Sequence, residues 1–202
     1  HTVTVISMGP ERATEAVRKA LSMGANDAIL ITDSKLAGAD ALATSAVLAG
    51  VIAKEGFELV LCGTESTDAR MSVVPAMLAE RLDAAQLTFA SSVTVDPAAS
   101  KVTITRVTEA GVDEMYASFP CVISVVEKIN EPRYPSFKGI MAAKKKVIDV
   151  RDLATVGVSV TSAWSIVADS APRPPRAAGI KVTDDGTGGE KLATYLAEKK
   201  LI

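Results

Sequence analysis

Three short apolar runs, each followed by a helical pattern, open the chain. The runs lie at 2–7, 28–31 and 59–62, and their near-continuous hydrophobicity is typical of strands buried on both faces. Apolar residues then recur every three or four positions in 11–23, and an alanine-rich helix is expected at 39–54. This alternation predicts an α/β fold with a mostly parallel sheet and helices on both faces.

The pattern changes after Leu82, where four consecutive strands are predicted. They lie at 87–95, 101–107, 112–118 and 122–126, with turn signals at Asp96-Pro97 and Ala110-Gly111 between them. Polar and apolar residues alternate in 101–107, so one face of this antiparallel hairpin is expected to meet solvent. The more uniformly apolar run from Cys121 is expected to return to the central sheet.

The last part of the chain is more polar. One helical turn is expected at 140–143, before the lysines at 144–146, and a strand at 147–150 and a short helical turn follow. The proline-rich stretch 171–176 predicts an extended linker, and 191–201 predicts an amphipathic helix. A tail with so little core of its own is expected to lie on its own domain or on a second subunit.

The loops that follow the first three strands are expected to lie along one edge of the sheet, because right-handed crossovers place them there. These loops are Met8-Gly9-Pro10, Thr32-Asp33 and residues 63–68. Ligands of open α/β sheets bind at the carboxyl ends of the strands. The three loops therefore predict one shared ligand.

The third loop has the chemistry of an anion site. Gly63 ends the strand, small polar residues follow, and a helix is predicted to start near Asp68. Free main-chain N–H groups in such a loop and at a helix N-terminus suit a phosphate. An ordinary turn with Asp68 as helix N-cap explains the pattern equally well, since neither a Walker lysine nor a G-x-G-x-x-G motif is present. Arg70 either pairs with phosphate or faces solvent.

Composition narrows the function. The 202 residues are 48% hydrophobic and can bury a core, while a net charge of −2 without a basic face argues against a nucleic-acid partner. The only histidine is His1, so His-based catalysis and His-rich metal sites are nearly excluded. Cys62 and Cys121 are expected to be buried and reduced. No apolar run reaches the length of a membrane span and no signal peptide is present, which favours a cytosolic protein.

Residues 134–143 do not fit a core pattern. Tyr134 and Phe137 stand where no periodicity requires them, close to the lysines at 144–146. A lysine triplet is usually a solvated surface. Aromatic residues on a mobile loop beside it are better explained as a contact surface for another protein.

Several segments together resemble the β subunit of electron-transfer flavoprotein. They are SMGPERATEAVRKALSMGA at 7–25, CGTESTD at 62–68, NEPRY at 130–134 with GIMAAKKK at 139–146, and AGIKV at 178–182. The resemblance spans essentially the whole chain, and the NEPRY and IMAAKKK motifs are its most specific part.

The resemblance implies a heterodimer in which an α subunit holds most of the FAD and the β subunit binds a structural AMP. Electrons would arrive from acyl-CoA dehydrogenases of fatty acid β-oxidation and related dehydrogenases, and leave to a membrane quinone oxidoreductase. Such a protein works in the bacterial cytoplasm or the mitochondrial matrix. FAD supplies the redox chemistry, so the protein is expected to be an electron carrier and not an enzyme.

The family resemblance also implies the domain organisation. An α/β nucleotide-binding domain of the adenine nucleotide alpha hydrolase kind is expected at 1–150, and an arm that wraps the α subunit at 151–202. Members of the family carry a further N-terminal strand region, including a loop that borders both nucleotide and flavin, which is not among these 202 residues.

Two sets of site residues follow from the resemblance. AMP is expected to contact Met8, Gly63, Thr64, Glu65, Ser66, Thr67, Asp68, Ala69, Arg70, Met71, Ser72, Val73 and Val74. Partner proteins are expected to contact Tyr134, Pro135, Ser136, Phe137, Lys138, Gly139, Ile140, Met141, Ala142 and Ala143, with Phe137 as the apolar anchor. No catalytic residue and no metal ligand is assigned.

Two other functions remain open. In a bifurcating variant, a second FAD would take the place of AMP. A stand-alone adenine-nucleotide-binding module would satisfy the same fold and loop, but it would need neither the proline-rich arm nor the surface around Phe137.

Overall fold

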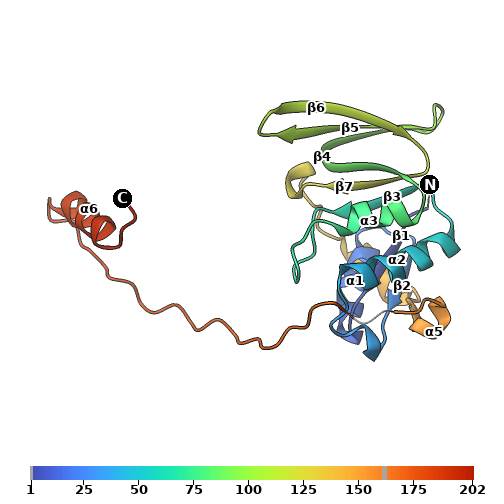
Figure 1. Ribbon diagram of the computed structural model, residues 1–202, viewed down its shortest axis with the longest axis horizontal. Helices are drawn as coiled ribbons and strands as arrows, with labels where there is room; N and C mark the ends of the chain where they lie inside the picture. The colour runs from blue at the N-terminus through green and yellow to red at the C-terminus, as the bar shows by residue number, and fades with distance from the viewer. Residues whose placement is uncertain (1, 161–162) are drawn as a thin grey trace. The chain divides into compact units, whose positions relative to one another are not determined.

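The computed structural model describes residues 2–160 and 163–202, which Figure 1 colours along the chain. They form two compact units, one reaching to Ile166 and the other comprising Val167–Ile202. His1, the single histidine of the sequence, lies outside the described residues. No helix in the described part has the length and apolarity that crossing a membrane requires.

The strand–helix alternation predicted for the start of the chain is confirmed. The elements are β1 (Thr4–Met8), η1 (Glu11–Ala13), α1 (Thr14–Ser22), β2 (Asp27–Ile31), η2 (Ser34–Leu36), α2 (Ala41–Glu55), β3 (Leu59–Gly63) and α3 (Val74–Arg81). The four predicted strands follow as β4 (Ala85–Asp96), β5 (Lys101–Thr108), β6 (Gly111–Ser118) and β7 (Cys121–Val125). The first unit ends with η3 (Glu127–Ile129), α4 (Phe137–Lys145), β8 (Asp149–Arg151) and α5 (Leu153–Val156).

The strands form two sheets, where the sequence predicted one. The first sheet has the order β1-β2-β8 and is parallel, while the second has the order β3-β7-β4-β5-β6. In the second sheet β7 runs parallel to β3 and β4, and β4, β5 and β6 are antiparallel. Within the described residues, β1 and β3 each pair along one edge only, so no strand joins the sheets.

The first sheet carries helices on both faces, as predicted. Leu30 of β2 packs with Val17 of α1 and Ala143 of α4. Its neighbours Ile29 and Ile31 point to the other face and pack with α2 and α5. This opposite orientation of successive residues explains why β2 is a continuous apolar run.

The two faces of β7 in the second sheet belong to different apolar clusters. Val122 of β7 packs with α2 and α3 on one face, whereas Ile123 packs with Val102 and Ile104 of β5 on the other. The register of β4 against β7 shifts between Leu87 and Ala90. The prediction that the run from Cys121 returns to the parallel strands is confirmed.

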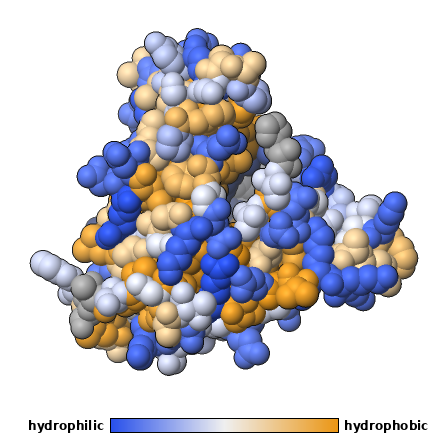
Figure 2. Space-filling view, turned by 90° about the vertical axis from the view of Figure 1, so that its right-hand side faces the viewer, coloured by the Kyte–Doolittle hydropathy of each residue, from blue (hydrophilic) through white to orange (hydrophobic). Residues whose placement is uncertain are grey.

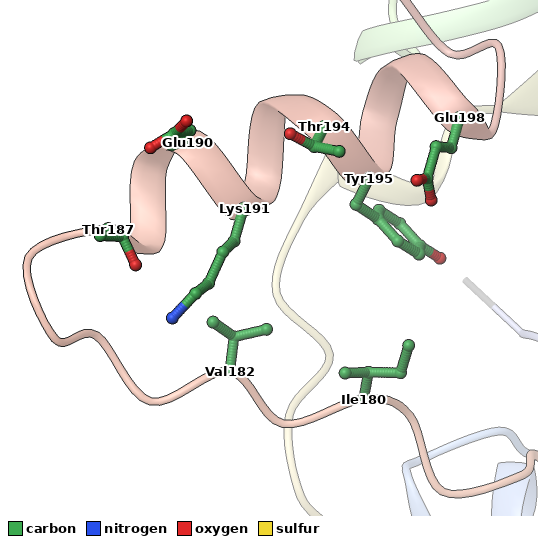
Figure 3. Close-up of a pocket in the computed structure, with 8 residues that line it drawn as sticks. All are labelled: Ile180, Val182, Thr187, Glu190, Lys191, Thr194, Tyr195 and Glu198. Atoms are coloured by element: carbon green, nitrogen blue, oxygen red, sulfur yellow. The ribbon is translucent and has the colours of Figure 1, made fainter.

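The second unit consists of an extended segment and helix α6 (Gly188–Glu198), which begins and ends three residues earlier than the predicted 191–201. The side chains of Ile180 and Val182 face Lys191 and Tyr195 of α6 across a shallow hollow (Figure 3). None of the residues 167–202 is buried.

Many large apolar side chains of the molecule are exposed. On the face drawn in Figure 2, hydrophobic patches alternate with hydrophilic ones. Exposed apolar patches of this kind mark interaction surfaces.

Candidate functional site

The loop after β3 is tied down at its base and exposed at its tip. The Thr64 hydroxyl donates to the main-chain oxygen of Val125 in β7 at 2.8 Å. Further along, the Arg70 N–H donates to the oxygen of Ser66 at 3.2 Å, and the Ser72 hydroxyl donates to Glu65 at 3.3 Å. The loop therefore closes on itself, with the side chains of 65–71 exposed.

The helix after this loop begins at Val74, so the prediction that it starts near Asp68 is wrong. Arg70 and Ser72 have φ angles of +50° and +57°, which a right-handed helix does not admit. The prediction that Asp68 is the N-cap is also wrong. Val73 occupies that position without a side-chain bond, while Asp68 accepts from the adjacent Ala69 N–H at 2.7 Å.

The electrostatics of the loop restrict how it can hold an anion. Hydrogen bonds from the Ser66 hydroxyl and then from the Ala69 N–H hold the pKa of Asp68 below its ordinary value. The acidic side chains of Glu65 and Asp68 oppose an anion, so main-chain N–H groups and the exposed Arg70 are the groups that favour one. The half-buried Cys62 stays a neutral thiol because burial raises its pKa to about 11.

Two of the three loops predicted to converge belong to the first sheet. The Gly9 N–H donates to the oxygen of Ile31 at 3.0 Å, which brings together the ends of β1 and β2. Met8 ends β1 and is half-buried against the apolar cluster of α2 and α5. The loop at 63–68 extends from the other sheet, and one apolar cluster containing Ile6 of β1 and Val60 of β3 connects the two strands.

Asp33, in the second of these loops, has a structural role. One carboxylate oxygen accepts from the Lys35 N–H at 2.9 Å, and the other accepts from the Leu153 N–H at 3.2 Å. The side chain thus caps η2 and the start of α5. Each of its oxygens therefore takes part in a hydrogen bond that holds the main chain.

A hollow of about 1080 Å³ lies beside Asp33, at the carboxyl ends of β2 and β8, where the sequence predicted no site of its own. Its other acidic side chain, Asp152, accepts from the N–H and the hydroxyl of Thr155 at 2.8 and 2.7 Å. These bonds, the hydroxyl first, lower the pKa of Asp152. Both carboxylates therefore serve as helix caps.

The segment predicted to contact partner proteins is mostly helical. Ser136 caps α4 by accepting from the Gly139 N–H at 3.1 Å, so the helix starts at Phe137 and is longer than the single predicted turn. Tyr134 and Phe137 are 97% and 80% exposed. Ala143 is only 1% exposed and packs on α1, which removes it from the surface.

The three lysines at 144–146 differ in their exposure to solvent. Lys144 and Lys145 are exposed, as expected of a solvated surface. Lys146 is not, because its ammonium group donates to the oxygens of Ala25 and Asn26 at 2.6 and 2.8 Å. No residue near Lys146 signals this contact, since its partners lie 121 and 120 positions away in the chain.

The described residues hold no grouping of three or more His, Cys, Asp or Glu side chains suited to a metal ion. The loop after β3 offers main-chain donors and the side chain of Arg70, and the segment 134–142 offers exposed aromatic side chains. Such groups can bind and position other molecules.

Comparison with known proteins identifies close relatives. The family described as "Electron transfer flavoprotein domain" matches residues 1–156. The chain is 49% identical over 206 residues to "Electron transfer flavoprotein subunit beta" of Mycobacterium leprae, covering 99% of this chain and 77% of the relative. A protein of the same name from Megasphaera elsdenii is 36% identical over 216 residues, covering 99% and 79%. "Protein FixA" of Azotobacter vinelandii is 38% identical over 162 residues, covering 78% and 58%.

Proposed function

Because the chain belongs to the electron transfer flavoprotein family, we propose that it is the beta subunit of such a flavoprotein. The observation that carries this proposal is the match of 99% of the chain to relatives that bear that name. The subunit would pair with an α subunit, carry electrons and have no catalytic side chains of its own. FAD, held mostly by the α subunit, would supply the redox chemistry.

The proposed arm for the α subunit is residues 151–202, and the second unit, Val167–Ile202, forms most of it. Its extended segment is proline-rich, and its apolar side chains stay exposed, among them Ile180 at 83% and Leu192 at 58%. An apolar surface of this kind gains free energy when a partner covers it. The arm would therefore become buried only in the heterodimer.

The loop at 63–74, together with Met8, is the proposed site of AMP. Ser72 is left-handed, with φ +57°, and the next residue, Val73, is right-handed, with φ −98° and ψ −21°; adjacent residues of opposite hand form the backbone pattern of anion-binding nests. Main-chain donors would hold the phosphate, and Arg70 would add a positive charge. Thr64 would keep the loop in place through its bond to β7.

Residues 134–142 are the proposed docking surface for acyl-CoA and related dehydrogenases. Phe137 would be the apolar anchor, and the exposed Lys138, Lys144 and Lys145 would attract a partner with an acidic rim. Electron transfer requires only a brief encounter, so a small interface is sufficient. A membrane quinone oxidoreductase would receive the electrons.

Co-expression with the α subunit tests the proposal. We expect a yellow complex that holds one FAD and one AMP per heterodimer, counted after extraction. Two flavins and no AMP would identify a bifurcating variant. A colourless chain that is stable alone and binds ATP as a homodimer would reject the proposal in favour of a stand-alone nucleotide-binding module.

A further inference from the structure

Helices α1 and α4 exchange cationic hydrogen bonds. Nη1 of Arg18 in α1 donates to the main-chain oxygen of Ala143 at 2.7 Å and to that of Lys146, at the end of α4. Nζ of Lys146 donates in return to the oxygens of Ala25 and Asn26, just beyond α1. Each helix therefore receives a positive charge near its carboxyl end, where carbonyls lack partners and the helix dipole is negative.

The segment 133–146, which contains α4, is also held at its first residue. The Arg133 guanidinium donates through Nε to the oxygen of Met23 at 3.0 Å, and through Nη2 to the same oxygen. Arg133 directly precedes Tyr134, and Lys146 follows the end of α4. The exposed aromatic residues thus lie between two fixed points, both on the carboxyl end of α1.

Gly139 sets how closely the two helices approach. A Cβ atom at this position would lie 2.6 Å from the main-chain oxygen of Ser22, so any larger residue would push α4 away from α1. Glycine destabilises a helix interior relative to alanine. The close contact explains why a glycine stands here.

From this geometry we infer that Arg18, Arg133 and Lys146 are positioning residues for electron-transfer partners. They hold α4 in one orientation on α1, so that Phe137 and Tyr134 project into solvent already ordered. Ordering before the encounter removes a conformational cost that a mobile loop would meet at each binding event. The inference rests on the proposed docking role of residues 134–142 and names the groups that fix that surface.

Steady-state kinetics of the heterodimer, with a reduced acyl-CoA dehydrogenase as electron donor, test the inference. Arg18→Gln is expected to raise KM for the donor roughly tenfold, the effect of losing a charged hydrogen bond, with kcat and flavin content unchanged. Lys19→Gln is the matched control, because it removes the same charge from the adjacent, exposed position. Arg18→Lys should recover part of the loss, since an ammonium group can still donate to the carbonyls.

Hydrogen exchange separates positioning from general unfolding. In the Arg18→Gln complex, the amides of α4 should exchange faster while those of β2 and β7 keep their protection. Gly139→Ala gives a second approach, because it keeps every cation but displaces the helix, and it should also raise KM. If Arg18→Gln fails to assemble, Gly139→Ala decides: an unchanged KM would overturn the inference.

Failure of the inference differs from failure of the docking role. If Phe137→Ala raises KM for the donor but Arg18→Gln raises it no more than Lys19→Gln does, positioning is rejected and docking stands. If Phe137→Ala has no effect either, the docking role itself is wrong.

Discussion

The hydroxyl of Thr64 lies 2.8 Å from the main-chain oxygen of Val125 and donates a hydrogen bond to it. The bond links the first side chain after β3 to the end of the neighbouring strand β7. It fastens the base of the exposed loop at 65–71 to the second sheet. This hydroxyl group therefore contributes to the orientation of the proposed nucleotide loop.

Thr64→Val keeps the shape of this side chain and removes the hydrogen bond. We expect a loss of about 1 kcal/mol in the free energy of unfolding, because the Val125 oxygen loses its partner. AMP content per heterodimer should fall as well, since the loop is no longer held. Urea unfolding and nucleotide extraction measure the two effects. Thr64→Ser retains the hydroxyl and should behave as the unchanged chain; equal losses in both variants would contradict this role.

Phe137→Ala should slow electron uptake from a dehydrogenase while leaving FAD content and thermal stability intact. The side chain is 80% exposed, so its removal opens no cavity in the core. Stopped-flow reduction of the bound flavin measures the effect. Tyr116→Ala is a suitable control, because Tyr116 is also an exposed aromatic, at 70%, but lies on β6 outside the docking surface. Equal slowing in both variants would point to a nonspecific effect.

The elements of the first unit could be predicted because buried positions of strands and helices are occupied by apolar residues in a regular pattern. Ile29, Leu30 and Ile31 are all apolar because the two faces of β2 are both covered. The start of α4 also had a local signal, the N-cap Ser136 before Phe137, which the predicted single turn overlooked. Regular patterns and caps are local, so one sequence is enough to find them.

The remaining differences depend on contacts between distant parts of the chain. Nothing near Lys146 indicates that its ammonium group reaches Ala25, which is 121 positions away. Neither Arg70 nor Ser72 favours the left-handed conformation, so closure of the loop imposes it on them. Because these two residues are not helical, α3 starts only at Val74. The division into two sheets depends on which strands pair, and no single strand encodes that choice.

Stability should fall between pH 9 and 11 in a way that depends on Cys62. Burial raises the pKa of this thiol from 9.0 to about 11, so the folded state keeps a proton that the unfolded state loses. The stabilisation is complete below pH 9 and disappears as the pH rises through the folded pKa. Urea unfolding across this range measures the slope. Cys62→Ala should show a flatter slope in addition to a loss that does not depend on pH; identical slopes would show that Cys62 does not contribute.

Deleting residues 167–202 should separate folding from assembly. The first unit ends at Ile166, and none of the deleted residues is buried, so its core clusters keep all their members. The shortened chain should therefore unfold at nearly the same temperature as the full chain. The shortened chain should form less heterodimer, because the exposed apolar side chains of α6 and of the segment before it are proposed to be covered by the α subunit. Size-exclusion chromatography after co-expression, with flavin absorbance, measures this loss.

The double variant Leu192→Glu and Tyr195→Glu keeps the full length, and it should weaken the heterodimer for the same reason. A stable yellow complex formed by both altered chains would show that the arm is not the element that holds the α subunit.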